Sequence, residues 1–288
     1  MSDNQGFPQP NEGKYRNIIQ EFMVERTRRP AGFSMGGPHY HPYYELYYLV
    51  TGRCRMFIQY KLYYVSAGDM VFLPPSCLHR TTYGQGQAVD RFTANFTPGF
   101  VRAFTESCTG GALPSAFPHQ KLTIPEGSRS EVEQLFSSMI RESLQEDPFT
   151  QIQKKSLLFQ LLALLGRCQQ AIPSPQLLVP DDEAIQQAAQ FIYRHHREPV
   201  SLEQAARAGH LSPTYFSRRF RQVTGMRFKE YLTHVRLLDA AELLRATGRP
   251  VTEIAVTCGF SDGNYFGDAF KKAYGMPPSQ FRKNRGPI

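Results

Sequence analysis

Four side chains that can bind a metal ion or a polar ligand lie in the first third of the chain: His39, His41, Glu45 and His79. The first three, together with Tyr47, occupy odd-numbered positions, so on a β-strand they would point to one face. Three imidazoles and a carboxylate could hold Fe, Mn, Ni or Zn. The same groups can hydrogen-bond a polar organic molecule, so residue types alone leave both kinds of site open.

A second group of candidates lies in the last third, where charges of one sign gather. The whole chain has 33 Lys and Arg against 25 Asp and Glu, a net charge of +8. Residues 181–288 carry +5 of this excess, and residues 204–229 contain six basic residues and no acidic one. Such a run is typical of a surface that binds a polyanion such as DNA, because an ordinary solvated helix mixes signs. Charge alone does not separate this interpretation from an ordinary basic surface.

The elements that position these residues can be predicted from sequence patterns. Runs of aromatic and β-branched residues, separated by turn formers, predict short strands over about residues 15–100 and favour a barrel or sandwich. Apolar residues at helical spacing predict two helices over residues 128–168, and the broad leucine face of the second suits a dimer contact as well as core burial. Residues 171–180 contain three prolines and predict an interdomain linker. Beyond them the pattern is helical.

The last hundred residues contain an internal repeat. Residues 202–231 align without gaps on residues 252–281, and eight of the thirty positions are identical. Each copy predicts a helix, a tight turn and a second helix, with a glutamate soon after the first cap. Gly209 and Gly259 are expected to end the first helices with positive φ. The expected N-caps, in chain order, are Ser201, Ser212, Thr252 and Asp262.

The second helix of each copy has phenylalanines four residues apart that point into a core. This is the layout of a helix-turn-helix, whose second helix lies in the DNA major groove. A long helix over residues 228–246 separates the copies and would set the two reading helices about one DNA turn (~34 Å) apart. The alternative is an all-α bundle made by duplication, with no role in DNA binding.

With this repeat, residues 184–285 resemble the double helix-turn-helix domain of the AraC/XylS family of transcription regulators. The resemblance implies that a set of residues faces DNA: Thr214, Ser217, Arg218, Arg221, Gly263, Asn264, Gly267, Asp268, Lys271 and Lys272. Arg218 suits guanine, Asn264 suits adenine, and the two lysines suit phosphates. The family often has a small polar residue followed by a basic one where this chain has Gly267-Asp268, so the second unit is expected to contribute less affinity or to read a different base.

Residues 37–83 resemble a cupin barrel. In metal cupins the two early His, the Glu and the later His bind one divalent ion, so the resemblance implies that His39, His41, Glu45 and His79 are the ligands of any metal. Regulators of the AraC/XylS family generally use the barrel for a small effector without metal. On that interpretation the ligand-binding residues are His39, His41, Glu45, Tyr47, His79, Thr81, Arg91 and Thr93. A sugar or polyol fits this mixture of rings and polar tips, and an organic acid that pairs with Arg91 or Arg53 fits nearly as well.

These observations together predict a two-domain α+β protein. The expected parts are an N-terminal arm (1–20), a cupin-like sensing and dimerisation domain with two packing helices (21–170), a linker (171–181) and an all-α double helix-turn-helix domain (182–288). We expect a ligand-responsive transcription regulator, not an enzyme, with promoter DNA and an effector as partners, a homodimer as its assembly, and RNA polymerase left open as a partner. A metal-dependent cupin dioxygenase or isomerase is the alternative, with metal in the barrel; otherwise no cofactor is expected.

Composition excludes several other classes. The chain is 41% hydrophobic and 20% charged, which argues against a disordered or collagen-like protein. No apolar run approaches the ~18 residues of a membrane span, and the first ten residues lack the layout of a secretory signal. The five cysteines are scattered, never in CxxC spacing, so they predict reduced thiols in a cytoplasmic protein.

Overall fold

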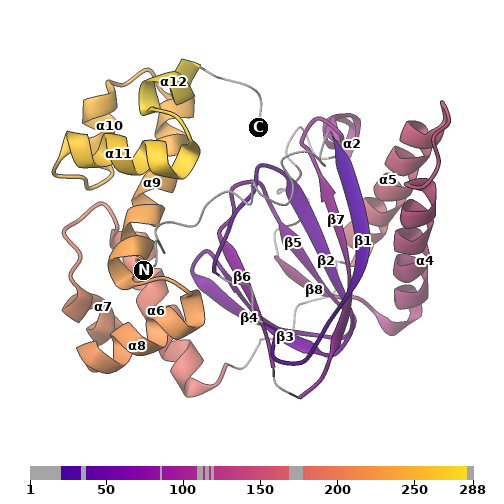
Figure 1. Ribbon diagram of the computed structural model, residues 1–288, viewed down its shortest axis with the longest axis horizontal. Coiled ribbons are helices and arrows are strands. Elements are labelled where there is room, and N and C mark those ends of the chain that lie inside the picture. Colours follow the sequence, from indigo (N-terminus) through magenta and orange to yellow (C-terminus); the bar gives the residue numbers. More distant parts are fainter. Residues whose placement is uncertain are drawn as a thin grey trace, which may run out of the picture.

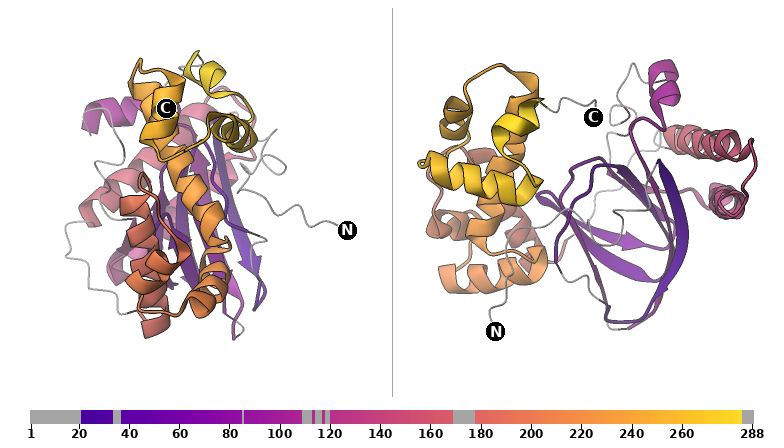
Figure 2. Two further views of the ribbon diagram at one scale, coloured as in Figure 1. Left: turned by 90° about the vertical axis from the view of Figure 1, so that its left-hand side faces the viewer. Right: turned by 45° about the horizontal axis from the view of Figure 1, so that its top comes forward.

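The computed structural model of the protein describes residues 21–33, 37–84, 86–108, 113, 117, 120–168 and 178–283. Two β-sheets form the N-terminal half and a bundle of helices forms the C-terminal half (Figure 1). Helices α4 and α5 lie on one side of the sheets and the C-terminal helices lie on the other (Figure 2). The predicted fold class, a β-barrel with two packing helices followed by an all-α domain, is confirmed.

The larger sheet has the strand order β1-β7-β2-β5-β8 and the smaller one the order β4-β3-β6. All of the strand pairs are antiparallel. The strands are β1 (Phe22–Arg29), β2 (Tyr44–Thr51), β3 (Arg53–Ile58), β4 (Lys61–Ser66), β5 (Asp69–Leu73), β6 (His79–Tyr83), β7 (Val89–Phe96) and β8 (Lys121–Thr123). Strand β8 and the short helix α2 (Arg102–Cys108) were not predicted. The two sheets enclose an apolar core to which both contribute, for example through Leu49, Met56 and Val71.

The outer face of the five-stranded sheet is covered by α4 (Glu126–Glu142) and α5 (Thr150–Cys168), which confirms the two helices predicted there. Alternation explains the arrangement, because Leu46 and Tyr48 of β2 point outward into this second core while Tyr47 points inward. Phe136 of α4 stacks on Phe92, with ring centroids 5.0 Å apart. The helices therefore anchor one sheet and leave the other free to contact the C-terminal domain.

Within the described residues 178–283 there are seven helices: α6 (Pro180–His195), α7 (Leu202–Ala208), α8 (Pro213–Thr224), α9 (Phe228–Ala246), α10 (Val251–Thr257), α11 (Gly263–Tyr274) and α12 (Pro278–Lys283). The expected arm (1–20) and residues 169–177 of the linker region lie outside the described residues. The linker was predicted to extend to residue 181, but Pro180 and Asp181 already belong to α6. Both helix-turn-helix units, α7–α8 and α10–α11, are present where the repeat predicted them.

Three of the four predicted N-caps need little or no correction. The side chains of Ser201, Ser212 and Asp262 each accept a hydrogen bond from a backbone N–H of the following helix. The capping partner of Ser201 is Gln204, however, and not Glu203. Thr252 was wrong as a cap, because α10 begins one residue earlier, after Pro250.

The two glycines between the paired helices differ in conformation. Gly259 has φ +88°, as predicted, but Gly209 has φ −95°. Gly209 is still required to be small, because a Cβ there would clash with the carbonyl oxygen of Ala184 in α6. The prediction of positive φ was therefore correct for one copy, and close helix packing explains the glycine in the other.

The C-terminal domain packs directly on the three-stranded sheet. Phe57, Leu62 and Leu78 of the barrel share one buried cluster with apolar residues of α6, α8 and α9. The sheet's outer face thus completes the core of the first helix-turn-helix unit, whereas the second unit has a separate core around α10 and α11. Among the described residues, no helix is both long and apolar enough to cross a membrane.

Candidate functional site

Helix α8 of the first unit exposes the residues predicted to read DNA. Phe216 and Phe220 are buried, so the opposite face carries Thr214, Ser217, Arg218 and Arg221, all exposed. Ser212 and Pro213 begin the helix, and Gly225 ends it in the left-handed conformation. The helix therefore presents a polar face with two guanidinium groups to solvent.

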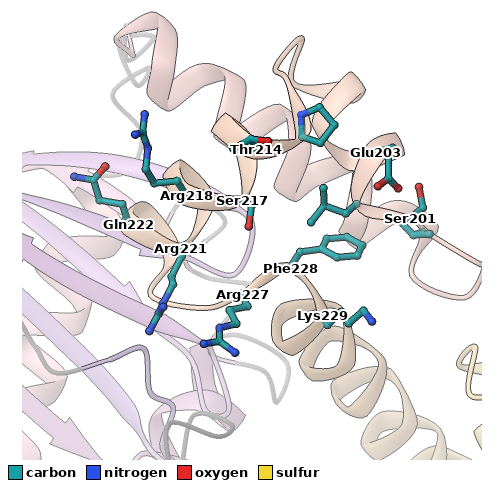
Figure 3. A pocket seen from close by; sticks show the side chains of 13 residues that line it. Ser201, Glu203, Thr214, Ser217, Arg218, Arg221, Gln222, Arg227, Phe228 and Lys229 are labelled. Atoms are coloured by element: carbon teal, nitrogen blue, oxygen red, sulfur yellow. The ribbon is translucent and has the colours of Figure 1, made fainter. Parts of the chain in front are cut away.

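An open groove of about 1210 Å³ runs along this face (Figure 3). It is lined by the beginning of α7, the exposed face of α8 and the beginning of α9. Arg227 and Lys229 line it together with Arg218 and Arg221, and Glu203 is its single acidic residue among those described. The charge run contained Arg227 and Lys229, but the predicted site did not include them, because they lie before and within the next helix.

One member of the basic run has a different role. Arg219 points away from the exposed face and donates from Nη2 to Asp182 Oδ1 at 2.8 Å. Asp182 is 1% exposed and also accepts from Arg55 Nη1 at 3.0 Å and from the hydroxyl of Tyr64 at 2.7 Å. Arg219 therefore ties α8 to α6 and to the barrel, and the basic run does not serve one surface.

Helix α11 of the second unit has the same design with fewer charges. Phe266 and Phe270 are buried, and the exposed face carries Gly263, Asn264, Asp268, Lys271 and Lys272. Gly267 is half-buried. A Cβ on either glycine would meet nothing within 4 Å, so they leave the face open rather than serve internal packing.

The barrel residues form a second candidate site. His41, Glu45 and His79 each offer one ligand atom, and these atoms all lie within 4.8 Å of one another. His41 Nε2 lies 2.9 Å from Glu45 Oε2, and His79 Nε2 lies 4.0 Å from the same oxygen. The described residues thus place three of the four predicted metal ligands together. His39 is not part of this triplet, although its ring lies 4.1 Å from that of His79.

The tautomers of this cluster follow from its backbone contacts. His41 Nδ1 lies 2.9 Å from the carbonyl oxygen of Tyr43, and His79 Nδ1 lies 2.9 Å from that of Cys77. A carbonyl oxygen only accepts, so both Nδ1 atoms carry the proton and both Nε2 atoms face Glu45. His41 Nε2 and Glu45 Oε2, 2.9 Å apart, can share a proton or can both bind one metal ion.

The electrostatics of the cluster suit a cation. Burial opposes the charge on Glu45, but the hydrogen bond from His41 and the charges of His41, His79 and Arg91 lower its pKa to about 2. Burial lowers the pKa of His39 to about 4 and that of His79 well below its usual value, so both rings are neutral at pH 7. An ionised Glu45, a neutral His79 imidazole and backbone-oriented Nδ1 atoms suit a divalent ion, so the cluster of His41, Glu45 and His79 fits one.

The other predicted ligand-binding residues line the same interior. Tyr47, Thr81 and Thr93 are almost fully buried. The guanidinium of Arg91 lies 5.0 Å from the centre of the Tyr47 ring. Alternation along β2, β6 and β7 therefore predicted which side chains face inward.

Three interior polar residues were missed. The Tyr47 hydroxyl lies 3.3 Å from that of Tyr83 and 3.6 Å from Cys54 Sγ. Asn95 is also buried, and its Oδ1 has no hydrogen-bond partner among the described residues. The same alternation, extended to residues 83 and 95, would have indicated two of them.

Two family models match this chain. The model described as an AraC-like ligand binding domain matches residues 24–162, and the one described as a helix-turn-helix domain matches residues 205–284. The HTH-type transcriptional activator RhaS of Escherichia fergusonii is 27% identical over 258 residues, which are 86% of this chain and 87% of that protein. The HTH-type transcriptional activator RhaR of Pectobacterium carotovorum is 26% identical over 269 residues, 93% of this chain and 91% of its own.

Solved structures give weaker similarity. ToxT from Vibrio cholerae is 12% identical with a TM-score of 0.36, and the match covers 93% of this chain and 99% of that one. The C-terminal domain of AraT from Geobacillus stearothermophilus is 40% identical with a TM-score of 0.34, over 35% of this chain and 85% of its own.

Proposed function

Since the chain belongs to the AraC family of transcription regulators, with a DNA-binding domain and an effector-binding domain, we propose a specific role for each domain. Helices α8 and α11 enter the major groove of promoter DNA and read its sequence. The barrel interior binds a small polar effector, a sugar or another metabolite, and its occupancy changes how the DNA-binding domain engages the promoter. The protein acts in the cytoplasm, where it meets that DNA.

The observation that carries this proposal is the groove at the first unit. Four cationic side chains from α8 and the beginning of α9 line it, and the buried phenylalanines fix which face of α8 is presented. Phosphates supply most of the affinity of such an interface, and side chains that reach base edges supply its specificity. Arg218 suits guanine O6 and N7, Asn264 suits adenine, and Lys271 and Lys272 suit phosphates of the second half-site.

The effector site rests on polar side chains that are buried or half-buried in the barrel interior. His41, Glu45 and His79 form one group, and the ring of His39 lies beside that of His79. Tyr47, Thr81, Arg91 and Thr93 line the same interior from neighbouring strands. Rings stack on the face of a sugar, and imidazole, carboxylate and hydroxyl groups take its hydroxyls.

Selection from a pool of random duplexes with the full-length protein tests the DNA part of the proposal. We expect enrichment of a sequence with two half-sites about one helical turn apart, one for each reading helix. A thermal-shift screen of sugars and organic acids then tests the barrel, because a ligand that binds only the folded state raises its stability. The proposal fails if no sequence is enriched.

A metal-dependent enzyme is the second candidate, favoured by one observation. His41 Nε2 and Glu45 Oε2 face each other at 2.9 Å with His79 beside them. A bound divalent ion would supply Lewis-acid chemistry to a ligand in the interior. Elemental analysis of the purified protein tests this candidate: one equivalent of metal that is lost in His79→Ala favours it, and metal-free protein that still binds DNA excludes it.

We also propose that the protein is a homodimer through α4 and α5, and the interaction with RNA polymerase stays a prediction. The connection between α4 and α5 and the first turn of α5 expose three large apolar side chains, Leu144, Phe149 and Ile152. Light scattering of the full-length protein and of Phe149→Glu together with Ile152→Glu tests the dimer, which should dissociate in the double variant.

A further inference from the structure

Two short segments of the barrel present alternate residues to its centre and to the DNA-binding domain. Residues 39–41 and the beginning of β6 are joined by a β-bridge in which His39 and His79 exchange backbone hydrogen bonds of 3.0 and 2.9 Å. His41 and His79 direct their Nε2 atoms at Glu45. Because successive side chains on extended backbone point in opposite directions, Tyr40 and Arg80 face outward.

Tyr40 reaches the second helix-turn-helix unit. Its hydroxyl donates to the carbonyl oxygen of Ala273 at 2.5 Å, one residue before the end of α11. Its ring also lies 5.7 Å from His234 of α9 and 6.4 Å from Tyr274. The last four carbonyls of a helix have no partner within it, so this hydroxyl completes the end of the second reading helix.

Arg80 does the same for the first unit. Its Nη1 donates to the carbonyl oxygens of Gln222 at 2.7 Å and Val223 at 3.3 Å, both in the last turn of α8. A cation at the carboxyl end of a helix also complements the helix dipole. Each reading helix therefore ends on a barrel residue that neighbours a histidine of the central cluster.

We propose that Tyr40 and Arg80 are positioning residues that couple the barrel centre to the orientation of both reading helices. The proposal rests on the function proposed above, that barrel occupancy controls DNA binding. Tyr40 is adjacent to His41 and Arg80 is adjacent to His79. A group that displaces either histidine therefore also displaces its neighbour. Any ligand that binds one arrangement of the centre better than another thereby changes the positions of α8 and α11.

A double-variant cycle tests this coupling without knowledge of the effector. The probe is a duplex selected by the full-length protein, and the readout is its dissociation constant by fluorescence anisotropy at fixed salt. Glu45→Gln removes the charge of the barrel centre, and we expect it to change operator affinity by about five-fold or more. In the Tyr40→Phe background or the Arg80→Met background the same substitution should change affinity less than it does in the wild-type chain, because one of the two connections is broken. When Tyr40→Phe and Arg80→Met are combined, it should change affinity less than two-fold. Arg80→Lys, which keeps a cation at the end of α8, should restore part of the response.

Tyr231→Phe is the matched control. The Tyr231 hydroxyl also crosses the domain interface to a carbonyl oxygen, that of Gln59 at 2.8 Å, but Gln59 lies in the turn between β3 and β4. Glu45→Gln should keep its full effect in this background. The inference is overturned if Glu45→Gln leaves operator affinity unchanged in the wild-type chain, or if its effect is equal in all backgrounds. Failure to select any duplex would instead overturn the proposed function.

Discussion

Adjacent arginines in α8 have separate tasks. Arg218 is exposed on the groove, whereas Arg219 pairs with the buried Asp182. Arg218→Ala should therefore weaken binding to the selected duplex by about 1–3 kcal/mol and relax one base position, with little change in thermal stability. Gel-shift titrations against single-base variants of the duplex measure both effects.

Arg219→Ala is the control for this prediction and should give the opposite result. It leaves Asp182 with one fewer partner in a buried network, so thermal stability should fall while the sequence preference stays unchanged. Equal loss of sequence preference in both variants would show that the two side chains face DNA together.

A buried histidine predicts a pH dependence of stability. Burial lowers the pKa of His234 from 6.5 to about 3, and its ring lies beside Tyr40 in the domain interface. Above pH 6.5 the ring is neutral in both the folded and the unfolded chain. As pH falls below 6.5, His234 is protonated in the unfolded chain but stays neutral in the folded chain. The free energy of unfolding therefore falls by up to about 1.4 kcal/mol per pH unit.

His234→Leu isolates this contribution, because the other titrating groups remain in both proteins. Urea unfolding between pH 4.5 and 7.5 should show a shallower loss of stability in the variant. If the two curves run parallel, His234 titrates normally in the folded chain and is not held neutral by burial.

At the scale of elements, the repeat offers a comparison between two equivalent glycines. Gly225 and Gly275 both end a reading helix in the left-handed conformation, with φ +80° and +74°. A Cβ on Gly225 would lie 2.7 Å from Pro38 Cδ and 3.0 Å from Arg80 Cδ, whereas one on Gly275 would meet nothing within 4 Å. The backbone conformation costs both alanine variants about 1 kcal/mol, and only Gly225→Ala also pushes the barrel away from α8.

Chemical denaturation and limited proteolysis distinguish the two variants. In Gly275→Ala the free energy of unfolding should fall only by the cost of the backbone conformation. In Gly225→Ala it should fall further, and protease sites between the domains should become accessible. If both variants lose the same stability, Pro38 and Arg80 can move away from α8 at no cost in free energy.

Local signals explain why most elements could be predicted. Ser212 and Asp262 cap their helices as expected, because a cap acts within three residues of chain. The prediction of Thr252 as a cap was wrong for an equally local reason. Pro250, with φ −53°, precedes α10 without a side-chain cap, so the helix begins before Thr252. Strand alternation placed Tyr47 and Thr81 inside the barrel, since it depends only on the parity of residue numbers.

Contacts between distant segments could not be predicted. Tyr40 meets Ala273 across 233 residues and Arg80 meets Gln222 across 142. A periodic pattern indicates which face of an element is buried, but it does not say which other element covers that face. The outer face of the three-stranded sheet was therefore not recognised as part of the first unit's core, and Arg219 was grouped with residues that face solvent.

For the whole molecule, the distribution of charge predicts how DNA affinity responds to salt. The groove of the first unit has Arg218, Arg221, Arg227 and Lys229, whereas α11 offers two lysines against Asp262 and Asp268. Removing one cation that neutralises a phosphate lowers the slope of log affinity against log salt by about 0.9. Arg218→Ala with Arg221→Ala should therefore reduce the slope more than Lys271→Ala with Lys272→Ala, although both pairs remove two charges. The measurement uses one selected duplex between 50 and 200 mM salt, a range over which the affinity of a phosphate-binding protein depends strongly on salt. A larger decrease in slope from the lysine pair would mean that the second unit binds most of the phosphates, and that Asp268 faces away from the DNA backbone.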